Sequence, residues 1–519
     1  MTTASPPATV APDTPRRALR AVAATDLLSL AVLFSLFGAL LLPLDRLPML
    51  MVDESRNALN ALGMDLHGHW LVPYYAGAPD HWNTKPPLLI WVIAALLRLG
   101  AAPLVALRLP SLLAAAGTLL AAWWFCRHVL ADARGAMLSG MLLLTSSLYM
   151  GPHVARSGDY DTLLCAFLLG QVLAFWIAIE TAAAISPWPF AAFAACVVGA
   201  VLTKAIEGAL LLPGLLLFAV LRGRLLALLR DPRVWLLTLA AVAVCLGYYL
   251  TRPLYDPGYL TAVWHNELGG RFAAVRDRST GGPLYYVIDT VRRFEPGLLL
   301  LPLAGFSLAS NDPRRRSAVL LLLLTSAVLL LVIVRSATKH FWYAAPMIPL
   351  LSIAAGIGTA DALCWLSRHA APRARRAPVA LGVLLACAAA VCVARNQVWS
   401  VRGLRAQEND QFWYGNFLDG LRESEAAHQL TVLDSGLPNR TGFVDYNPML
   451  QFYAAWETQH GMPVALREAG GTLTPGSEVA TCDPAAMSWL AARHDVAIMR
   501  RTSACILARV TPQRGADAG

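Results

Sequence analysis

The chain has 519 residues, of which 57% are hydrophobic and 14% are charged, and its mean hydropathy is +0.52. Soluble globular domains carry about 25% charged residues, so this composition excludes a soluble globule and predicts a membrane protein. The net charge of +9 does not indicate nucleic-acid binding. The arginines lie in short clusters between apolar runs, where membrane proteins carry their orientation signals.

The N-terminal tail, residues 1–20, is rich in Pro, Ala and Thr, and we expect a disordered cytoplasmic segment. The apolar run that follows has no small-residue cleavage site after it and is predicted to be an uncleaved first helix. Apolar runs able to cross the roughly 30 Å hydrocarbon layer then recur up to about residue 395, which delimits a transmembrane domain over 21–395. We expect about eleven spans, at 22–42, 105–126, 134–151, 161–180, 189–203, 206–221, 234–251, 288–310, 317–334, 342–366 and 378–395.

If all of these segments cross, the connecting loops alternate sides and the arginine clusters fall together on one side, which the positive-inside rule makes the cytoplasm. This agreement requires that residues 86–99 do not cross. Their apolar core of about 11 residues is too short, so the segment is predicted to be an interfacial or re-entrant helix in the first outer loop.

From residue 396 to 519 the pattern changes to short β-like runs separated by helical stretches, which predicts a small soluble α/β domain on the outer side. The strands are expected at "LTVLD", "MPVALRE", "SEVATCD", "DVAIMRR" and "ACILARV". Cys482 and Cys505 lie in this domain and could pair if it faces an oxidising space, although sequence does not give their geometry.

The predicted outer loops carry an unusual set of polar residues, including all three lysines of the chain. They are Asp53, Glu54, Arg56, His81 and Lys85, then Asp159 and Asp161, then Lys204, then His265 and Arg271, and finally Lys339 and Tyr343. Any one of them could be an ordinary charge at headgroup level. As a group they favour one shared polar cavity, because an unpaired ionised residue costs roughly 2.5–3.5 kcal/mol at the bilayer centre.

Carboxylates beside lysine, arginine and histidine suit a reaction in which a base takes a proton from a nucleophile while cations hold a departing phosphate. Nucleotide sugars and ATP are not generally available outside the cytoplasm. An activated group must then arrive on a molecule that crossed the bilayer, such as a lipid phosphate. The apolar helix at 86–99 offers an isoprenoid chain a surface beside Lys85, worth about 0.8 kcal/mol per buried CH₂.

The ordered motifs resemble the integral-membrane GT-C glycosyltransferases, in the protein O-mannosyltransferase-like branch that includes the lipid A aminoarabinose transferase. The matching pieces are "VDESRNALNALGMDLHGHWLVPYYAGAPDHWNTKPPLLIWVIAALLRLG", "ALRLPSLLAAAGTLL", "ARSGDYDTLL", "TKAIEGALLLPGL", "HNELGGR" and "ATKHFWYAAPMIPLLSIAAG". They occur in family order over about residues 50–360.

The resemblance implies a hexosyl- or pentosyltransferase of the bacterial inner membrane. It would transfer a sugar, with inversion, from a polyprenyl (undecaprenyl) phosphate donor to a hydroxyl of a glycan, lipid or protein acceptor on the outer face. Asp53, in the acidic pair with Glu54, would activate the acceptor, and Asp161, with Asp159 as the second choice, would support it. Lys85 and Arg271 would bind the donor phosphate near His265 and Tyr343, and Lys204, Lys339 and Arg56 would line the same cavity.

The chain departs from the family at Thr84, where glutamate is common and is often associated with a divalent metal ion. His265 alone is a poor metal site. His81, Asp80 or Glu54 could compensate, so the sequence leaves the metal open.

Two other functions remain open at this point. A transporter or flippase of lipid-linked sugars would carry charges near the middle of its spans or in paired broken helices. A receptor-like scaffold for the terminal domain would need neither the acidic pair nor the lysines. The sugar, the acceptor and the oligomeric state are not encoded in any motif found.

Overall fold

The computed structural model describes residues 14–41, 44, 49–50, 53–272, 281–293, 295–369, 377–406, 414–424, 429–435 and 447–512. Among these residues, seven helices are long and apolar enough to cross a membrane. Their apolar stretches are Ala23–Leu41, Pro103–Val129, Tyr160–Glu180, Pro187–Ala209, Pro232–Leu254, Pro313–Arg335 and Met347–His369. Each coincides with an expected span, which agrees with a multi-pass membrane protein.

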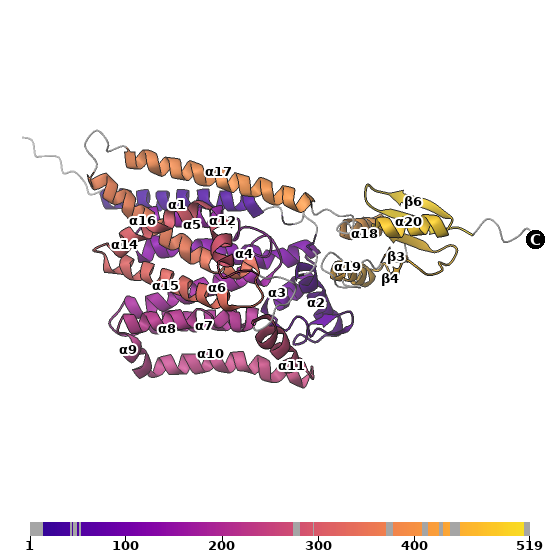
Figure 1. Cartoon of the computed structure of the whole chain (residues 1–519), viewed down its shortest axis with the longest axis horizontal. Helices are drawn as coiled ribbons and strands as arrows, with labels where there is room; N and C mark the ends of the chain where they lie inside the picture. Colours follow the sequence, from indigo (N-terminus) through magenta and orange to yellow (C-terminus); the bar gives the residue numbers. More distant parts are fainter. Residues whose placement is uncertain are drawn as a thin grey trace, which may run out of the picture.

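The helices of this part run roughly parallel along the long axis of the molecule (Figure 1). They are α1 (Thr14–Leu41), α4 (Pro103–Trp124), α5 (Ala133–Thr145), α6 (Tyr160–Glu180), α7 (Pro187–Lys204), α8 (Leu212–Leu221), α10 (Pro232–Thr251), α15 (Pro313–Arg335), α16 (Met347–His369) and α17 (Ala377–Ala406). Short connecting helices are η1 (Phe125–Val129), η2 (Ala205–Ala209), α9 (Leu225–Arg230), η3 (Arg252–Leu254), α11 (Tyr259–Val263), η4 (Trp264–Phe272) and η6 (Phe341–Ala344).

Three of the expected spans correspond to shorter helices in the structure. The segments 134–151 and 206–221 contain apolar helices at Ala133–Thr145 and Leu212–Leu221. The segment 378–395 lies within α17, which has 30 residues. The segment 288–310 is divided into α12 (Tyr285–Arg293), α13 (Glu295–Leu300), η5 (Leu301–Leu303) and α14 (Ala304–Leu308). Pro302 lacks the amide proton that a continuous helix would use there.

Two expected boundaries lie elsewhere in the structure. Residues 1–13 of the expected tail are outside the described part, whereas α1 begins at Thr14, so residues 14–20 are helical and not disordered. The expected domain boundary at residue 396 falls inside α17, which continues to Ala406.

One end of the helical part gathers arginines and their acidic partners. Arg315, at the start of α15, lies 2.5 Å from Asp361 of α16 and 3.4 Å from Asp132, which precedes α5. Arg222, which follows α8, pairs with Glu180 at the end of α6 at 2.8 Å. Ion pairs therefore join the helix ends that the alternation of loops assigned to the cytoplasmic side.

The opposite end carries the first long loop, folded as α2 (Asp53–His67), the hairpin β1 (Tyr74–Tyr75) and β2 (Ala78–Pro79), and α3 (Leu88–Arg98) (Figure 1). Helix α2 begins with Asp53 and Glu54, whose charges favour the positive end of the helix dipole. Helix α3 has 11 residues, as the short apolar run predicted, and buries Leu89, Ile90 and Ile93 against α2 and α4.

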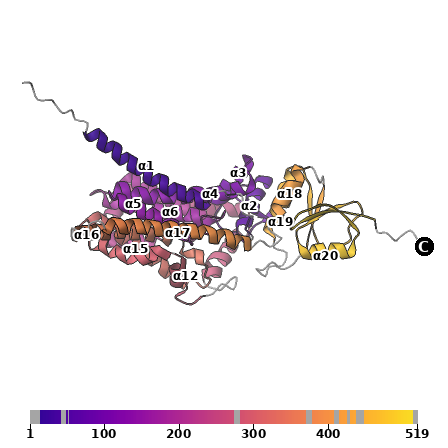
Figure 2. The same ribbon diagram turned by 90° about the horizontal axis from the view of Figure 1, so that it is seen from above.

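The terminal domain is an α/β unit beyond α2 (Figures 1 and 2). Its five-stranded sheet has the order β4 (Val464–Glu468), β3 (Leu430–Asp434), β5 (Glu478–Thr481), β7 (Ile506–Val510) and β6 (Val496–Arg501). The pairs β3/β4 and β3/β5 are parallel, and β5/β7 and β6/β7 are antiparallel. All five strands coincide with the β-like runs, and Cys482 and Cys505 form a disulfide.

The terminal domain and the first loop share one hydrophobic core. Helices α18 (Tyr414–Glu423) and α19 (Pro448–Gln459) contribute Phe417, Leu450 and Phe452 to the cluster that includes Leu59 of α2 and Ile93 of α3. The helix α20 (Pro484–Arg493) belongs to a separate small cluster with the sheet. Helix α2, which starts at Asp53, therefore packs against both α3 and α19.

Candidate active site

Two expected acids and one histidine meet where α2 approaches the start of α6. Asp159 is the N-cap of α6, its Oδ1 accepting from the Tyr160 amide at 2.7 Å. The His153 Nδ1 lies 3.1 Å from Asp159 Oδ2 and 3.6 Å from Asp53 Oδ2. Burial opposes the charged imidazole, but the hydrogen bond to Asp159 and the charges of Asp53 and Asp161 outweigh it and raise the pKa of His153. The Asp53 side chain remains partly exposed, with 39% of its surface accessible to solvent.

In the first turn of α6, two residues after Asp159, Asp161 forms a buried ion pair with Lys204. The Lys204 Nζ lies 2.8 Å from Asp161 Oδ1 and 2.9 Å from Glu207 Oε2, and 5.3 Å from the centroid of the Tyr343 ring. Gly208 allows this geometry because a side chain there would place its Cβ 2.4 Å from the backbone of Ala200, so η2 packs directly on α7. Two carboxylates therefore surround one ammonium group.

Glu54 is buried and accepts hydrogen bonds from neighbouring segments of the chain. Its carboxylate accepts from Arg108 Nε at 2.8 Å, from the Gly158 amide at 2.8 Å and from the Leu50 amide at 2.7 Å. Gly158 immediately precedes Asp159, so this carboxylate links the Asp53 turn to the start of α6. A Cβ at Gly158 would lie 2.4 Å from the Leu107 side chain, which leaves no room for another residue.

A cavity of about 330 Å³ extends from the Asp161–Lys204 pair between α6, α15 and η2. Its polar lining consists of Asp161, Lys204, Glu207, Glu267, Ser336 and Tyr343, and its apolar lining of Leu164, Leu168, Ile206, Leu210, Leu329, Val332, Ile333 and Pro346. Cavities of this size accommodate small ligands or part of a larger one. The lining suits a molecule with a polar head and an apolar tail.

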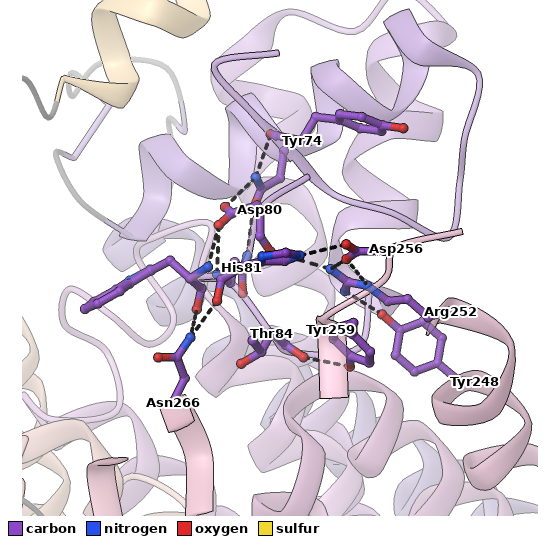
Figure 3. A network of polar contacts seen from close by, with 12 residues as sticks. Tyr74, Asp80, His81, Thr84, Tyr248, Arg252, Asp256, Tyr259 and Asn266 are labelled. Carbon is purple, nitrogen blue, oxygen red and sulfur yellow. Dashed lines mark hydrogen bonds and ion pairs between the residues drawn. The ribbon is translucent and has the colours of Figure 1, made fainter. Parts of the chain in front are cut away.

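A polar network fixes the loop that carries Lys85 (Figure 3). His81 Nε2 lies 2.7 Å from Asp256 Oδ1, and the buried Arg252 donates to Asp256 Oδ2 at 3.1 Å and to the Tyr248 hydroxyl at 2.8 Å. The Asn266 amide donates to the His81 carbonyl at 2.6 Å. Residues 81–84 are thereby joined to the segments η3, α11 and η4.

Thr84 links this network to the cavity, and Lys85 follows it in the chain. The Thr84 hydroxyl donates to Glu267 Oε1 at 2.9 Å, and Glu267 lines the cavity. The Lys85 Nζ lies 5.1 Å from the centroid of the Tyr160 ring and, among the described residues, has no carboxylate within ion-pair distance. An ammonium group with an aromatic neighbour and no acidic partner is available to an anionic ligand.

The remaining expected residues are placed as follows. Arg56 forms a bidentate pair with Asp80, both contacts at 2.7 Å, which outweighs burial and lowers the pKa of Asp80. Lys339 donates to the carbonyls of Val334 and Ser336 at 2.8 and 2.7 Å, caps the end of α15 and does not line the cavity. His265 is exposed in η4. Arg271 also lies in η4, but its side chain is outside the described residues.

The residues that the sequence offered as metal ligands do not gather. His81, Asp80 and Glu54 are engaged with Asp256, Arg56 and Arg108 respectively. In the described part of the chain, the set that could hold an ion is Asp53, His153 and Asp159, whose ligand atoms lie within 4.8 Å of one another. Two carboxylates and an imidazole suit a divalent cation, which would have to replace the proton between His153 and Asp159.

Sequence reasoning missed His153 and Trp342 as members of the site. One signal could have found His153, which lies in the same predicted outer loop as Asp159. Glu267 was expected among the polar residues of the outer loops and Glu207 as the partner of Lys204, and the structure places them there. The ring of Trp342 stacks on His153 with centroids 4.0 Å apart, which no spacing in the sequence predicts.

Fold and site together define a multi-pass membrane protein with an acidic, lysine-containing centre at one end of its helices. Residues 84–249 match the family described as dolichyl-phosphate-mannose-protein mannosyltransferase. The chain is 26% identical over 274 residues to undecaprenyl phosphate-alpha-4-amino-4-deoxy-L-arabinose arabinosyl transferase of Pseudomonas savastanoi pv. phaseolicola. That match covers 51% of this chain and about half, 49%, of the relative.

The structure has the fold of ArnT from Cupriavidus metallidurans. The crystal structure of that protein bound to undecaprenyl phosphate gives a TM-score of 0.64 at 18% identity and covers 93% of this chain and 97% of that one. Its apo structure gives 0.63 at 15% identity and covers 94% and 98%. These likenesses show the fold, and the family match and the arabinosyl transferase relative agree with the resemblance to the integral-membrane GT-C glycosyltransferases.

Proposed function

We propose that the chain is a glycosyltransferase that moves a sugar from a polyprenyl-phosphate donor to an acceptor hydroxyl on the extracytoplasmic side of a bacterial inner membrane. The observation that carries the proposal is the Asp161–Lys204 pair at the polar end of an apolar cavity, with Asp159 two residues away and joined through His153 to Asp53. Undecaprenyl phosphate, the lipid bound to ArnT in its crystal structure, has an anionic head and an apolar tail, which matches the polar and apolar lining of this cavity.

Asp53 is the base in this proposal. Its carboxylate is half-exposed, whereas Glu54, Asp159 and Asp161 are buried and paired. Asp53 takes the proton of the acceptor hydroxyl as the acceptor oxygen attacks the anomeric carbon. A positioned base contributes roughly 10²–10⁴-fold to such a reaction.

The leaving group is the lipid phosphate. As the new C–O bond forms on one face of the sugar, the bond from the anomeric carbon to the phosphate oxygen breaks on the other, which inverts the configuration. The bonding electrons stay on the phosphate. Lys85, with no acidic partner among the described residues, and Arg271 of η4 are the cations we assign to it, together with Tyr343 of the cavity lining.

The other acids hold the site together in this proposal. Glu54 fixes the Asp53 turn to Gly158, and Lys204 balances Asp161 beside the cavity. A divalent ion, when bound by Asp53, His153 and Asp159, would supply a positive charge beside the acceptor hydroxyl. The steps above use only side chains of the chain itself.

The experiment that tests the function is mass spectrometry of polyprenyl-phosphate lipids and envelope glycans in a deletion strain. The proposal predicts that one lipid-linked sugar accumulates and one glycan decoration disappears, and that the wild-type gene reverses both. Unchanged lipids and glycans would contradict it. If the purified chain instead moved lipid-linked sugar across vesicles without forming product, a transporter would replace the enzyme.

A further inference from the structure

His153 has no part in the steps given above, although it touches the proposed base. Its Nδ1 donates to the Asp159 carboxylate at 3.1 Å and lies 3.6 Å from Asp53 Oδ2. The second distance is too long for a direct hydrogen bond but is within ion-pair range. The imidazole therefore lies between an acid that is anchored as the N-cap of α6 and an acid that remains partly exposed.

Two aromatic residues of η6 fix the plane of the His153 imidazole. His153 stacks on the Trp342 ring at 4.0 Å and 16°, and meets the Phe341 ring edge-on at 6.0 Å. Both aromatic residues belong to η6, which also carries Tyr343 over Lys204. Through this stack, the segment beside the cavity sets the position of the ring that faces Asp53.

The backbone at His153 limits which residues can stand there. Its φ of +65° lies in the left-handed region, which histidine and asparagine adopt more readily than most other residues. Asparagine is therefore a suitable replacement, because it keeps the backbone and removes the ring. An alanine at this position would add backbone strain to the loss of the ring.

We propose that His153 is a positioning residue that holds the Asp53 carboxylate, between Asp159 and the Trp342 ring, in the orientation from which it takes the acceptor proton. The inference rests on the proposed function, because it assigns a partner to the proposed base. A displacement of about 1 Å at a reacting group can lower a rate about 100-fold, so loss of the ring should act on the chemical step.

The kinetic test compares His153→Asn with wild type in purified full-length protein supplied with the accumulated lipid-linked sugar. We expect kcat to fall about 10- to 100-fold while the KM for the donor stays within about twofold. Trp342→Leu should reproduce the loss of kcat and Trp342→Phe should retain most of the activity. His128→Asn is the matched control, because His128 also meets a tryptophan ring but lies in η1 at the other end of the α4 span.

Two readouts do not depend on turnover. In thermal unfolding, His153→Asn combined with Asp159→Asn should lower the midpoint by less than the sum of the two single changes, because each removes the same contact. If the decreases in midpoint were strictly additive, the inference would be overturned, whether or not the wild type transferred sugar. A wild type that transferred no sugar would refute the proposed function. Wild-type kcat in His153→Asn would also overturn the inference. So would a divalent ion bound stoichiometrically by wild type and lost from His153→Asn, since His153 would then be a metal ligand.

Discussion

The lysines Lys85 and Lys204 differ in what surrounds their ammonium groups. Lys204 is buried between two carboxylates, whereas Lys85 lies over an aromatic ring and is partly exposed. Both were expected at the site from their place in the outer loops. The ion pairs that engage Glu54 and Arg56 were not, because their partners Arg108 and Asp80 lie 54 and 24 residues away in elements whose contact only the fold determines.

Replacement of Lys85 by arginine keeps the charge but exchanges a compact ammonium group for a planar guanidinium. If Lys85 binds the donor phosphate, the variant should use the donor with a KM raised roughly tenfold or more, measured as the initial rate against donor concentration. Arg98→Lys is the control, since Arg98 ends α3 with 67% of its side chain exposed. Equal effects of the two exchanges would argue against Lys85 as a phosphate ligand.

Replacement of Lys204 by methionine leaves the buried Asp161 and the partly exposed Glu207 without their cation. Breaking a buried ion pair in this way costs roughly 3–5 kcal/mol, so the midpoint of thermal unfolding should fall clearly. Adding Asp161→Asn to the same variant should recover part of the loss. A single variant as stable as wild type would show that the pair is solvated in the protein.

At the scale of elements, the terminal domain followed its sequence pattern closely. All five strands lie at the β-like runs, and the helices α19 and α20 lie between strands, as the helical stretches between the runs predicted. The segment 288–310 did not follow its pattern, because its apolar composition suggested one span while the structure divides it into α12, α13, η5 and α14. The docking of α19 on α2 was not predictable either, since both are amphipathic helices whose partners the sequence does not specify.

The pH dependence of the terminal domain should be set by Glu457 of α19. Burial, together with the neighbouring Asp419 carboxylate, raises the pKa of Glu457 to about 8 despite Arg422. The folded state then binds a proton that the unfolded state releases above about pH 4.5, so stability should fall as pH rises from about 4.5 to about 8. Glu457→Gln should flatten this slope in thermal unfolding of the full chain. An unchanged slope would place the proton elsewhere.

The disulfide between Cys482 and Cys505 should stabilise the same domain. It closes a loop over a sequence separation of 23 residues, for which the chain-entropy model gives about 3 kcal/mol. Cys482→Ala/Cys505→Ala should lower the unfolding midpoint of the domain, and a reductant should lower wild type equally. Cys387→Ala, at an exposed free cysteine, is the control. A midpoint insensitive to reductant would show that the bond is not formed.

At the scale of the whole molecule, the two ends of the helical part differ in charge chemistry. Arginines pair with acids at one end, as in the Arg315–Asp361 contact, and the lysines, the proposed base and the terminal domain lie at the other (Figures 1 and 2). The sequence predicted this separation from the alternation of loops. It could not predict the cavity, which forms between helices distant in the sequence.

The separation predicts which end faces the cytoplasm. Alkaline phosphatase fused after residue 512 should be active, because the terminal domain is expected outside, and a fusion after residue 310 should be inactive. The reverse pattern would place the site in the cytoplasm, where the argument for a lipid-linked donor no longer applies.

The proposed function depends above all on Asp53 as the base of a sugar transfer from a lipid phosphate. The most direct measurement is product formation by purified full-length protein supplied with the lipid-linked sugar from the deletion strain. Asp53→Asn should lower the rate at least about 100-fold. The same exchange at Asp65 of α2, which only pairs with the exposed Arg98, should leave it within about twofold. Wild-type turnover by the Asp53→Asn variant would contradict the account.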